Sequence, residues 1–378
     1  MFYRNRACLC GDAAFGRGDR VCGTRTGAGC IMSKTAVVIC PGRGTYTKSE
    51  LGYLARHHGD AMAHLAAFDR ERAALGQQTL ADLDGAARYQ TAVHTRGDNA
   101  SALIYAASFL DAQKIPEQIE VVGVTGNSMG WYSALAVSGA ATPENAFRIV
   151  NTMGTLMQDS MIGGQSLYPF VDENWRQIPG LRDRLLAQVA EIDHRPDHRL
   201  AVSIHLGGML VVAGNDAGLS AFEQSVTPVQ GRFPMRLANH AAFHTALQEP
   251  VAAQGRAVLG AALFQPPRRP LIDGRGAVWY PKACTIEALR AYTLGHQVVA
   301  PYDFTSAITV AARTFAPDLF IITGPGTTLG GAVAQALISI EWQGMTSKED
   351  FQSRQRSAPV LLSMGLDADR ARLMCADF

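Results

Sequence analysis

The chain has 378 residues and a mass of 40.5 kDa, enough to bury the core of one large domain or of two smaller ones. Its formal net charge is +1, with 18% charged and 47% hydrophobic residues, which argues against a disordered polymer and against a strongly basic nucleic-acid binder. No apolar run reaches the roughly 18 residues that suggest a membrane span, so we expect a soluble, cytoplasmic protein that binds neither nucleic acid nor membranes.

Residues 1–31 are rich in Gly and Arg and contain four of the seven cysteines. The spacing of these four cysteines matches no zinc pattern, and the segment lacks the apolar h-region of a signal peptide. We expect it to be a disordered tail or an extension upstream of a start at Met32. Without a signal peptide, we expect a reducing compartment and free thiols.

Beyond this segment, apolar runs typical of buried strands alternate with helical patterns. The run "TAVVIC" at 35–40 predicts a strand, and helices are predicted at about 49–75 and 99–113, the second with Asn99 as its N-cap. The run "EVVGVTG" at 120–126 predicts a second strand, followed by its own helix. Strands that alternate with helices indicate parallel βαβ units.

The pattern changes between residues 163 and 239. Strand-like "SLYPFVD", "LAVSIHLG", "MLVVAGN" and "RFPMRLAN" are joined by two helical stretches in the order β-α-β-β-α-β, which predicts an inserted ferredoxin-like subdomain at 163–239. A helix at 243–263 and further strands then return the chain to the large α/β domain with its parallel sheet, predicted at 32–162 and 240–345. Residues 346–378 are expected to be a C-terminal tail.

A serine stands where the strand at 120–126 meets its helix, in "GNSMG" at 126–130. This is the G-x-S-x-G pattern of a nucleophile elbow, in which the glycines permit a sharp turn and the hydroxyl stands above the sheet. The helix that follows adds positive potential where an oxyanion would form. We therefore predict that Ser128 is a nucleophile; the alternative is a plain strand-to-helix turn capped by Ser128.

A nucleophilic serine requires a base, and the chain has ten histidines. None follows His296, so the order serine, acid, late histidine of the α/β-hydrolases is not met. His240 and His244 are four residues apart, a spacing that can bind metal on a helix. Because Ala241 breaks the H-E-x-x-H pattern, we expect no metal.

Five motifs in order resemble those of the malonyl-CoA:acyl carrier protein transacylases and the related acyltransferase domains of fatty-acid and polyketide synthases. They are "VICPGRGTY", "GNSMGWYSALAVSGA" with its helix, "AFHTALQEP", "LGHQVVAPYDF" and "TGPGTTLGG". The resemblance covers roughly residues 34–340. It implies an α/β-hydrolase-like large domain with an inserted ferredoxin-like subdomain.

The resemblance also implies a mechanism. Ser128 would attack the thioester of an acyl-CoA, His244 would take its proton, and the acyl-serine would pass to the phosphopantetheine thiol of an acyl carrier protein in a ping-pong reaction. Backbone carbonyls of the turn at Asp273 and Gly274 are expected to orient His244. No cofactor is implied beyond the coenzyme A thioester, which is a substrate.

The oxyanion hole and the acyl pocket contain departures from the family pattern. The implied oxyanion donors are the backbone N–H groups of Met129 and Arg43, where Arg43 replaces a glutamine. Met153 occupies the position of the arginine that binds the malonyl carboxylate, and Asn127 replaces a histidine beside the nucleophile. The Arg43 guanidinium either reaches into the pocket in place of the missing arginine or is a solvated loop side chain.

The sequence therefore predicts an acyltransferase in fatty-acid or polyketide synthesis, with malonyl as the family's default acyl group. Met153 keeps two alternatives open: transfer of acetyl or another uncharged acyl group, and hydrolysis of an acyl thioester. A third alternative is a catalytically silent protein that only binds acyl carrier protein.

Overall fold

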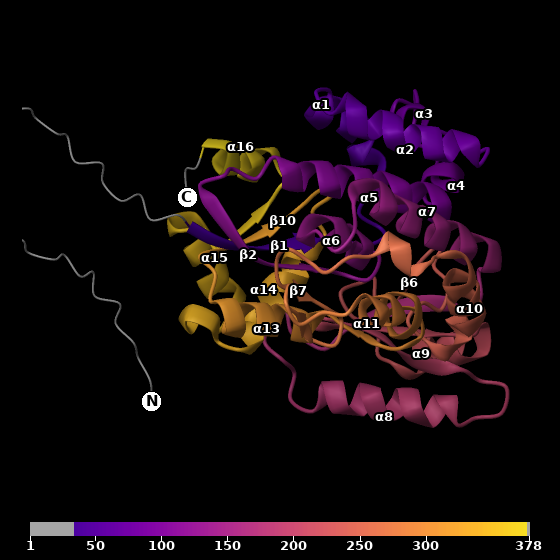
Figure 1. The fold of residues 1–378 in the computed structure, drawn as a ribbon. Coiled ribbons are helices and arrows are strands. Elements are labelled where there is room, and N and C mark those ends of the chain that lie inside the picture. The colour runs from indigo at the N-terminus through magenta and orange to yellow at the C-terminus, as the bar shows by residue number, and fades with distance from the viewer. Residues whose placement is uncertain (1–33, 376–378) are drawn as a thin grey trace, which may run out of the picture. The chain divides into compact units, whose positions relative to one another are not determined.

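The fold is built around two β-sheets, and the computed structural model describes it for residues 34–375 (Figure 1). The larger sheet has the order β11-β10-β1-β2-β7-β8; every pair is parallel except β7 with β8. Its strands are β1 (Lys34–Cys40), β2 (Ile119–Gly126), β7 (Leu271–Ile272), β8 (Val278–Trp279), β10 (Leu319–Ile322) and β11 (Leu361–Ser363). The predicted α/β fold with a parallel sheet is confirmed, while the expected tail or extension at 1–31 lies outside the described residues.

Strand β1 is central in the larger sheet, and its sequence explains why. Residues 36–40 are an uninterrupted apolar run with no solvent exposure, as expected for a parallel strand that is covered on both faces. Val38 pairs with Val124 of β2 on one side and with Ile321 of β10 on the other. Because β1 and β2 are parallel neighbours, the segments that follow them emerge at the same edge of the sheet, where ligand sites of α/β proteins form.

The smaller sheet has the order β6-β3-β5-β4-β9. Its strands are β3 (Gly164–Pro169), β4 (Leu200–Leu206), β5 (Met209–Gly214), β6 (Met235–Arg236) and β9 (Tyr302–Asp303). Helix α8 (Leu181–Asp193) lies between β3 and β4, and α9 (Asp216–Ser225) lies between β5 and β6, which is the element order predicted for 163–239. The first four strands pair antiparallel, whereas β9 joins β4 in parallel from outside this segment.

The remaining helices cover the larger sheet and one end of the molecule (Figure 1). They are α1 (Tyr53–His58), α2 (Met62–Ala74), α3 (Leu80–Asp84), α4 (Thr91–His94), α5 (Gly97–Gln113), α6 (Gly130–Ser138), α7 (Pro143–Ser160), α10 (Glu249–Val258), α11 (Ile286–Ala291), α12 (Gln297–Val299), α13 (Phe304–Phe315), α14 (Leu329–Ser339), α15 (Lys348–Ser357) and α16 (Asp367–Cys375), with a π-helical turn at Tyr292–His296. Helix α5 is buried along residues 97–111 and packs on α6 and α7. It is buried on all sides, and its core-facing residues include polar side chains such as Asn99 and Asp111.

Three helix predictions need correction. Asn99 is not an N-cap, because α5 begins two residues earlier; its amide instead donates to Val93 O at 3.1 Å and accepts from the buried Arg72 at 2.5 Å. The helix expected at 49–75 is interrupted between α1 and α2, and the one expected at 243–263 begins only at Glu249. For Asn99, the tertiary contacts of its side-chain amide override the local capping signal.

The C-terminal tail expected for 346–378 is wrong for residues 348–375. Strand β11 extends the larger sheet by pairing with β10, and α16 packs beside it. Arg370 of α16 reaches the fully buried carboxylate of Asp111 at 2.7 Å, and that carboxylate also accepts from Tyr53, His58 and the Gly324 N–H. The end of the chain is therefore tied into the core.

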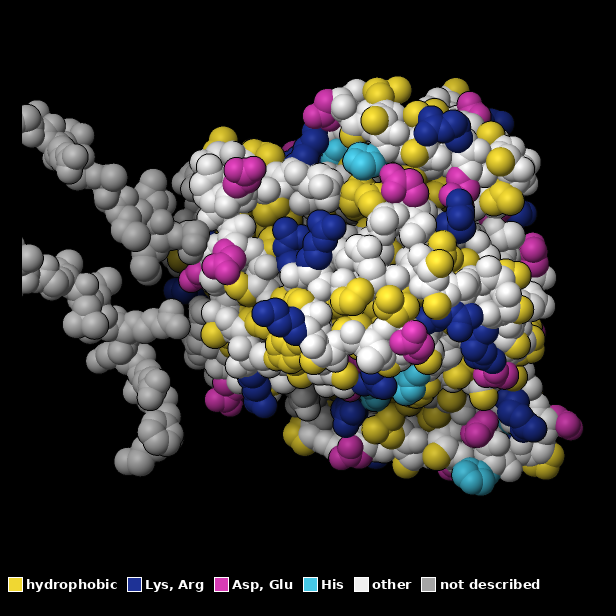
Figure 2. Space-filling view, in the orientation of Figure 1, with side chains coloured by type: hydrophobic (Ala, Val, Ile, Leu, Met, Phe, Trp, Pro, Cys, Tyr) yellow, Lys and Arg dark blue, Asp and Glu magenta, His cyan; other side chains and the backbone are white. Residues whose placement is uncertain are grey.

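The described surface carries charges of both signs. On the face shown in Figure 2, Lys and Arg side chains are interspersed with Asp and Glu, as the net charge near zero would suggest. Of the helices within residues 34–375, none combines the length and the apolar character needed to cross a membrane.

Candidate active site

Ser128 occupies the sharp turn between β2 and α6. Its φ is +54°, a left-handed conformation that is uncommon for a residue with a side chain and that raises the hydroxyl above the sheet. A Cβ on Gly126 would lie 2.3 Å from the carbonyl carbon of Gly130, and one on Gly130 would lie 2.1 Å from the carbonyl oxygen of Cys40. Gly126 is therefore required for the turn to close on itself, and Gly130 for the turn to pack against the end of β1.

His244 faces Ser128 from the loop before α10. The serine Oγ and the histidine Nε2 are 2.7 Å apart. On the other side of the ring, Nδ1 lies 2.6 Å from the carbonyl oxygen of Gln297. Since a carbonyl oxygen can only accept, Nδ1 carries the proton and Nε2 presents its lone pair to the serine hydroxyl. This is the geometry of a nucleophile with its general base.

The environment of His244 keeps the ring neutral. Burial lowers the pKa of His244 from 6.5 to about 4; the hydrogen bond to the Gln297 carbonyl raises it, and the nearby His296 lowers it further. No carboxylate contacts the ring among the described residues to favour the charged form. His244 is consequently able to accept a proton at neutral pH.

The turn expected to orient His244 does not do so. The orienting carbonyl belongs to Gln297 in α12, and not to Asp273 or Gly274. Gln297 also uses its side chain: Nε2 donates to Ser128 O at 3.1 Å, and Oε1 accepts from the Tyr132 hydroxyl at 3.0 Å. It lies in "LGHQVVAPYDF", one of the five motifs that resemble the transacylase family.

Asp273 and Gly274 support the site from a distance. The buried carboxylate of Asp273 is held by Arg275 at 2.6 Å. A Cβ on Gly274 would lie 2.5 Å from ring atoms of Tyr302. Because Gly274 leaves this space, Tyr302 packs 5.4 Å from the His244 ring, centroid to centroid, and donates its hydroxyl to the carbonyl of Gly126 in the elbow.

The two predicted oxyanion donors lie in the segments after β1 and β2. Neither the Arg43 N–H nor the Met129 N–H donates a hydrogen bond within the part of the chain that the structure describes. The two segments are in contact, since the Asn127 N–H donates to Cys40 O at 2.9 Å and a Cβ on Gly42 would lie 2.5 Å from Asn127 O. Two free donors beside the nucleophile are what an oxyanion hole requires.

A cavity of about 20 Å³ adjoins Ser128 and His244. Arg43 lines it, together with apolar side chains of α7 and Phe243. A volume of this size holds about one or two water molecules, so an acyl group bound here would have to enlarge the cavity.

Two of the three predicted pocket residues, Met153 and Asn127, do not line the cavity beside Ser128. Met153 is fully buried and is not among the residues that line the cavity; its sulfur packs on α10, where a Cβ on Gly255 would lie 2.7 Å from it. The Asn127 side chain lies against Gly42 and does not line the cavity either. Sequence alignment gave the position of Met153 on α7 but not the direction of its side chain.

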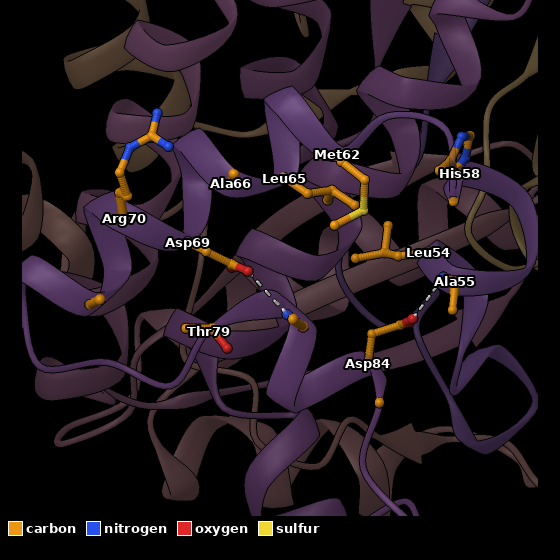
Figure 3. A pocket seen from close by; sticks show the side chains of 14 residues that line it. Leu54, Ala55, His58, Met62, Leu65, Ala66, Asp69, Arg70, Thr79 and Asp84 are labelled. Atoms are coloured by element: carbon orange, nitrogen blue, oxygen red, sulfur yellow. Dashed lines mark hydrogen bonds between the residues drawn. The ribbon is translucent and has the colours of Figure 1, made fainter.

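A larger apolar hollow of about 550 Å³ lies among α1, α2 and α3 (Figure 3). Its carboxylates already accept backbone N–H groups: Asp69 from Leu80 at 2.6 Å, and Asp84 from Ala55 at 3.2 Å. No nucleophile with a base lines it, so we assign the chemistry to the smaller cavity beside Ser128.

Comparisons with known proteins concern the sequence and the fold of the chain. No family model matches the chain. It is 25% identical over 211 residues to the malonyl CoA-acyl carrier protein transacylase of Salmonella typhimurium, covering 55% of this chain and 63% of that one, and 24% identical over 223 residues to the enzyme of the same name from Bacillus subtilis, covering 57% and 67%. The chain thus spans less than two thirds of the length of the Salmonella relative.

Solved structures extend the likeness to nearly the whole fold. The malonyl-CoA:acyl carrier protein transacylase of Xanthomonas oryzae superposes with a TM-score of 0.71 at 18% identity, covering 91% of this chain and 98% of that one. The chain has the transacylase fold. A malonyl transacylase in complex with a type II polyketide synthase acyl carrier protein superposes with a TM-score of 0.70 at 18% identity, covering 91% and 100%. The resemblance to the malonyl-CoA:acyl carrier protein transacylases that the five motifs indicated is confirmed.

Proposed function

We propose that the protein is an acyltransferase that moves an acyl group from coenzyme A to the phosphopantetheine thiol of an acyl carrier protein through an acyl-serine at Ser128. The observation that carries the proposal is the hydrogen-bonded series from Ser128 Oγ through the His244 ring to the Gln297 carbonyl. The names of the relatives support malonyl-CoA as the donor and acyl carrier protein as the acceptor. A cytoplasmic location and a role in fatty-acid or polyketide synthesis go with this proposal.

In the first half-reaction, Ser128 Oγ attacks the carbonyl carbon of the thioester, and its proton passes to Nε2 of His244. The new carbon–oxygen bond gives a tetrahedral oxyanion. When this collapses, the carbon–sulfur bond breaks, and the departing coenzyme A thiolate takes the proton from Nε2. The Gln297 carbonyl accepts from Nδ1 throughout and keeps the ring in the tautomer that the step needs.

The second half-reaction reverses these steps with a new thiol. The phosphopantetheine sulfur attacks the acyl-serine carbonyl carbon and gives its proton to His244 Nε2. The carbon–oxygen bond to Ser128 then breaks, and Oγ recovers the proton from the histidine. The enzyme is returned unchanged, and the acyl group has exchanged one thioester for another.

The backbone N–H groups of Arg43 and Met129 would stabilise both oxyanions. Each is free of an acceptor in the described part of the chain, and one donor of this kind contributes roughly a hundredfold or more to the rate. Because only backbone atoms are involved, the replacement of the family's glutamine by Arg43 leaves this role intact.

The experiment that tests the proposal follows the acyl group after it leaves coenzyme A. The acyl-enzyme is formed with malonyl-CoA, freed of excess donor by rapid gel filtration, and divided between buffer, phosphopantetheinylated carrier protein and the same carrier without phosphopantetheine. Intact-protein mass then reports the acyl group on each partner.

We expect the adduct to persist in buffer and with the unmodified carrier, and to move to the phosphopantetheinylated carrier. If the acyl group is lost from the enzyme to water at the same rate in all three samples, the protein is a thioester hydrolase and not a transferase. A protein that binds the carrier but never forms an adduct would be the catalytically silent partner.

A further inference from the structure

Arg43 is a cation at the wall of the Ser128 cavity that has no ion pair among the described residues. Its Nη2 donates to the backbone carbonyls of Thr95 at 2.8 Å and Asn239 at 3.0 Å, and its guanidinium carbon lies 5.3 Å from the centre of the Phe243 ring. The second nitrogen, Nη1, is buried and has no hydrogen-bond partner in the part of the chain described. The side chain is thus held in place while one of its donors is left unused.

The unused donor lies at the cavity and away from solvent. A Cβ on Gly97 would lie 3.5 Å from Nη1 and 2.8 Å from the carbonyl oxygen of Gly154, and Gly154 lines the cavity together with Ser128. Nη1 therefore lies near the point where the first turn of α5 meets α7, and both Arg43 and Gly154 line the cavity beside Ser128.

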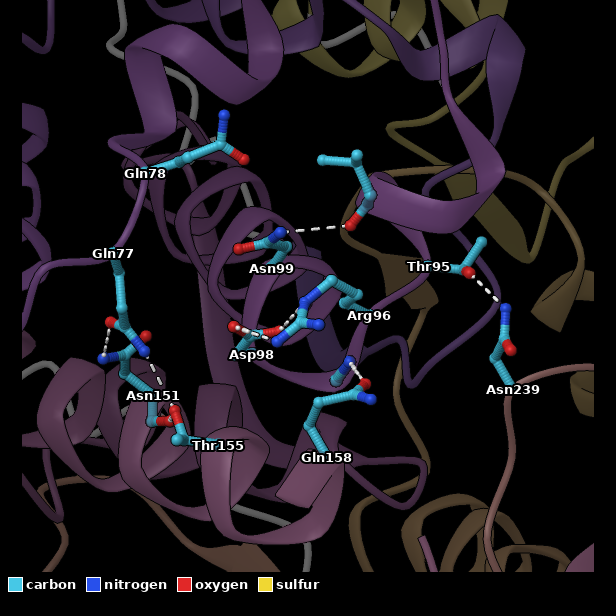
Figure 4. Close-up of polar contacts among 12 residues, drawn as sticks. Gln77, Gln78, Thr95, Arg96, Asp98, Asn99, Asn151, Thr155, Gln158 and Asn239 are labelled. Carbon is cyan, nitrogen blue, oxygen red and sulfur yellow. Dashed lines mark hydrogen bonds and ion pairs between the residues drawn. The ribbon is translucent and has the colours of Figure 1, made fainter.

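The side chains of Thr95, Arg96, Asp98 and Asn239 are paired with one another (Figure 4). The Asn239 amide donates to the Thr95 hydroxyl at 2.6 Å. Asp98, the acid whose charge acts on Arg43, accepts from Arg96 at 3.1 and 3.3 Å. None of these groups accepts from Nη1, which leaves this donor free to bind an acceptor on a ligand.

The charge on Arg43 persists at neutral pH although the side chain is partly buried. Burial lowers the pKa of Arg43 to about 10, while the charge of Asp98 raises it. His240 adds no charge, because burial, reinforced by the charge of Arg43, lowers its pKa to about 3. A buried charged donor without an acceptor is unfavourable, and a carboxylate is the acceptor that suits a guanidinium best.

We propose that Arg43 binds a carboxylate at the far end of the acyl group and so makes the protein selective for carboxylated acyl groups over neutral ones of the same shape. This rests on the proposed acyl transfer at Ser128. Arg43 would then contribute twice, with its backbone N–H at the thioester oxygen and its guanidinium at the carboxylate. Because Met153 of α7 packs away from the cavity, the cation is supplied here from the loop after β1.

The test compares malonyl-CoA with isovaleryl-CoA, whose acyl group has two methyl groups where malonyl has two carboxylate oxygens. Rate constants for acylation of Ser128 are measured by intact-protein mass for the unmodified protein, Arg43→Gln, Arg43→Lys and a matched control, Arg148→Gln. Arg148 is an exposed arginine of α7 that pairs with Glu71. Thermal denaturation checks that each variant is folded.

For the unmodified protein we expect malonyl to react roughly tenfold to a hundredfold faster than isovaleryl, the range for a hydrogen bond to a charged group. Arg43→Gln should reduce the malonyl-to-isovaleryl ratio toward one, Arg43→Lys should recover part of it, and Arg148→Gln should leave it unchanged.

Two failures can be told apart. If no thioester acylates the unmodified protein, the proposed function itself is overturned. If malonyl acylates it but the ratio survives in folded Arg43→Gln, the role of Arg43 is wrong and acyl transfer stands. Should Arg43→Gln not fold, equal rates for the two thioesters with the unmodified protein would overturn the proposal without any variant.

Discussion

The acylation of Ser128 should be almost independent of pH between 7.5 and 5.5. The reason is the burial of His244, which lowers its pKa from 6.5 to about 4, so that the neutral ring needed as a base persists well below the usual range of histidine. The other charged group of the cavity, Arg43, has a pKa of about 10 and does not change its protonation over this interval.

The magnitude follows from the two pKa values. A change from 6.5 to about 4 corresponds to roughly 3 kcal/mol in favour of the neutral imidazole. A histidine with an ordinary pKa would be only about one-tenth neutral at pH 5.5, whereas His244 would be almost entirely neutral there. The two cases therefore differ about tenfold in rate at pH 5.5.

The assay is the second-order rate constant for acylation by malonyl-CoA at low substrate concentration, since this quantity reports the pKa of the free enzyme. We expect a change of less than about twofold between pH 7.5 and 5.5. A tenfold fall with a midpoint near 6.5 would refute the argument that burial sets the pKa of His244.

The control is the stability of the fold at each pH. In the unfolded chain His244 binds a proton below about 6.5, whereas in the fold it does so only below about 4. Proton binding to this group therefore favours unfolding increasingly as the pH falls through that window. Circular dichroism and the free energy of unfolding in urea at each pH separate this effect from the rate of acylation.

Two further predictions concern the framework of the site. Gly130→Ala places a Cβ 2.1 Å from Cys40 O, so we expect a lower unfolding midpoint and slower acylation. The matched control is Gly331→Ala, whose Cβ would meet nothing within 4 Å. Equal effects of the two substitutions would contradict the close approach of Gly130 to Cys40. Asp111→Asn leaves Arg370 without its buried counter-charge. We expect urea denaturation to show a decrease of about 3–5 kcal/mol in the free energy of unfolding. A decrease below about 1 kcal/mol would mean that the Asp111–Arg370 pair contributes little to stability.

The pairing of Ser128 with His244 could be predicted because the sequence signals for both residues are local. A serine between two glycines, where an apolar strand ends and a helix begins, predicts a sharp strand-to-helix turn. The structure contains this turn, with Ser128 at a positive φ. His244 came from a motif, and the structure places it 2.7 Å from Ser128.

The residue that orients the histidine could not be predicted in the same way. Its contribution is a backbone carbonyl, and every residue has one, so no side chain indicates that Gln297 and not the turn at Asp273 lies beside Nδ1. The direction of Met153 was missed for a related reason: helical periodicity places a residue on a helix, but packing against Gly255 decides which neighbour it meets.

Strand β11, at the edge of the larger sheet, could not be predicted because it forms by pairing with a strand distant in the sequence. Strand β11 is only three residues long and follows a polar helix, so its sequence alone resembles a tail. It becomes a strand because β10 offers an unpaired edge and because Arg370, shortly after it, reaches the buried Asp111.

The central claim is that an acyl group becomes covalently attached to Ser128. The most direct measurement is peptide mapping by mass spectrometry after brief incubation with malonyl-CoA, with Ser128→Ala treated identically. We predict the malonyl mass increment on the peptide that contains Ser128 and on no other peptide, and none in Ser128→Ala. An adduct on another residue, or one that persists undiminished in Ser128→Ala, would contradict the account.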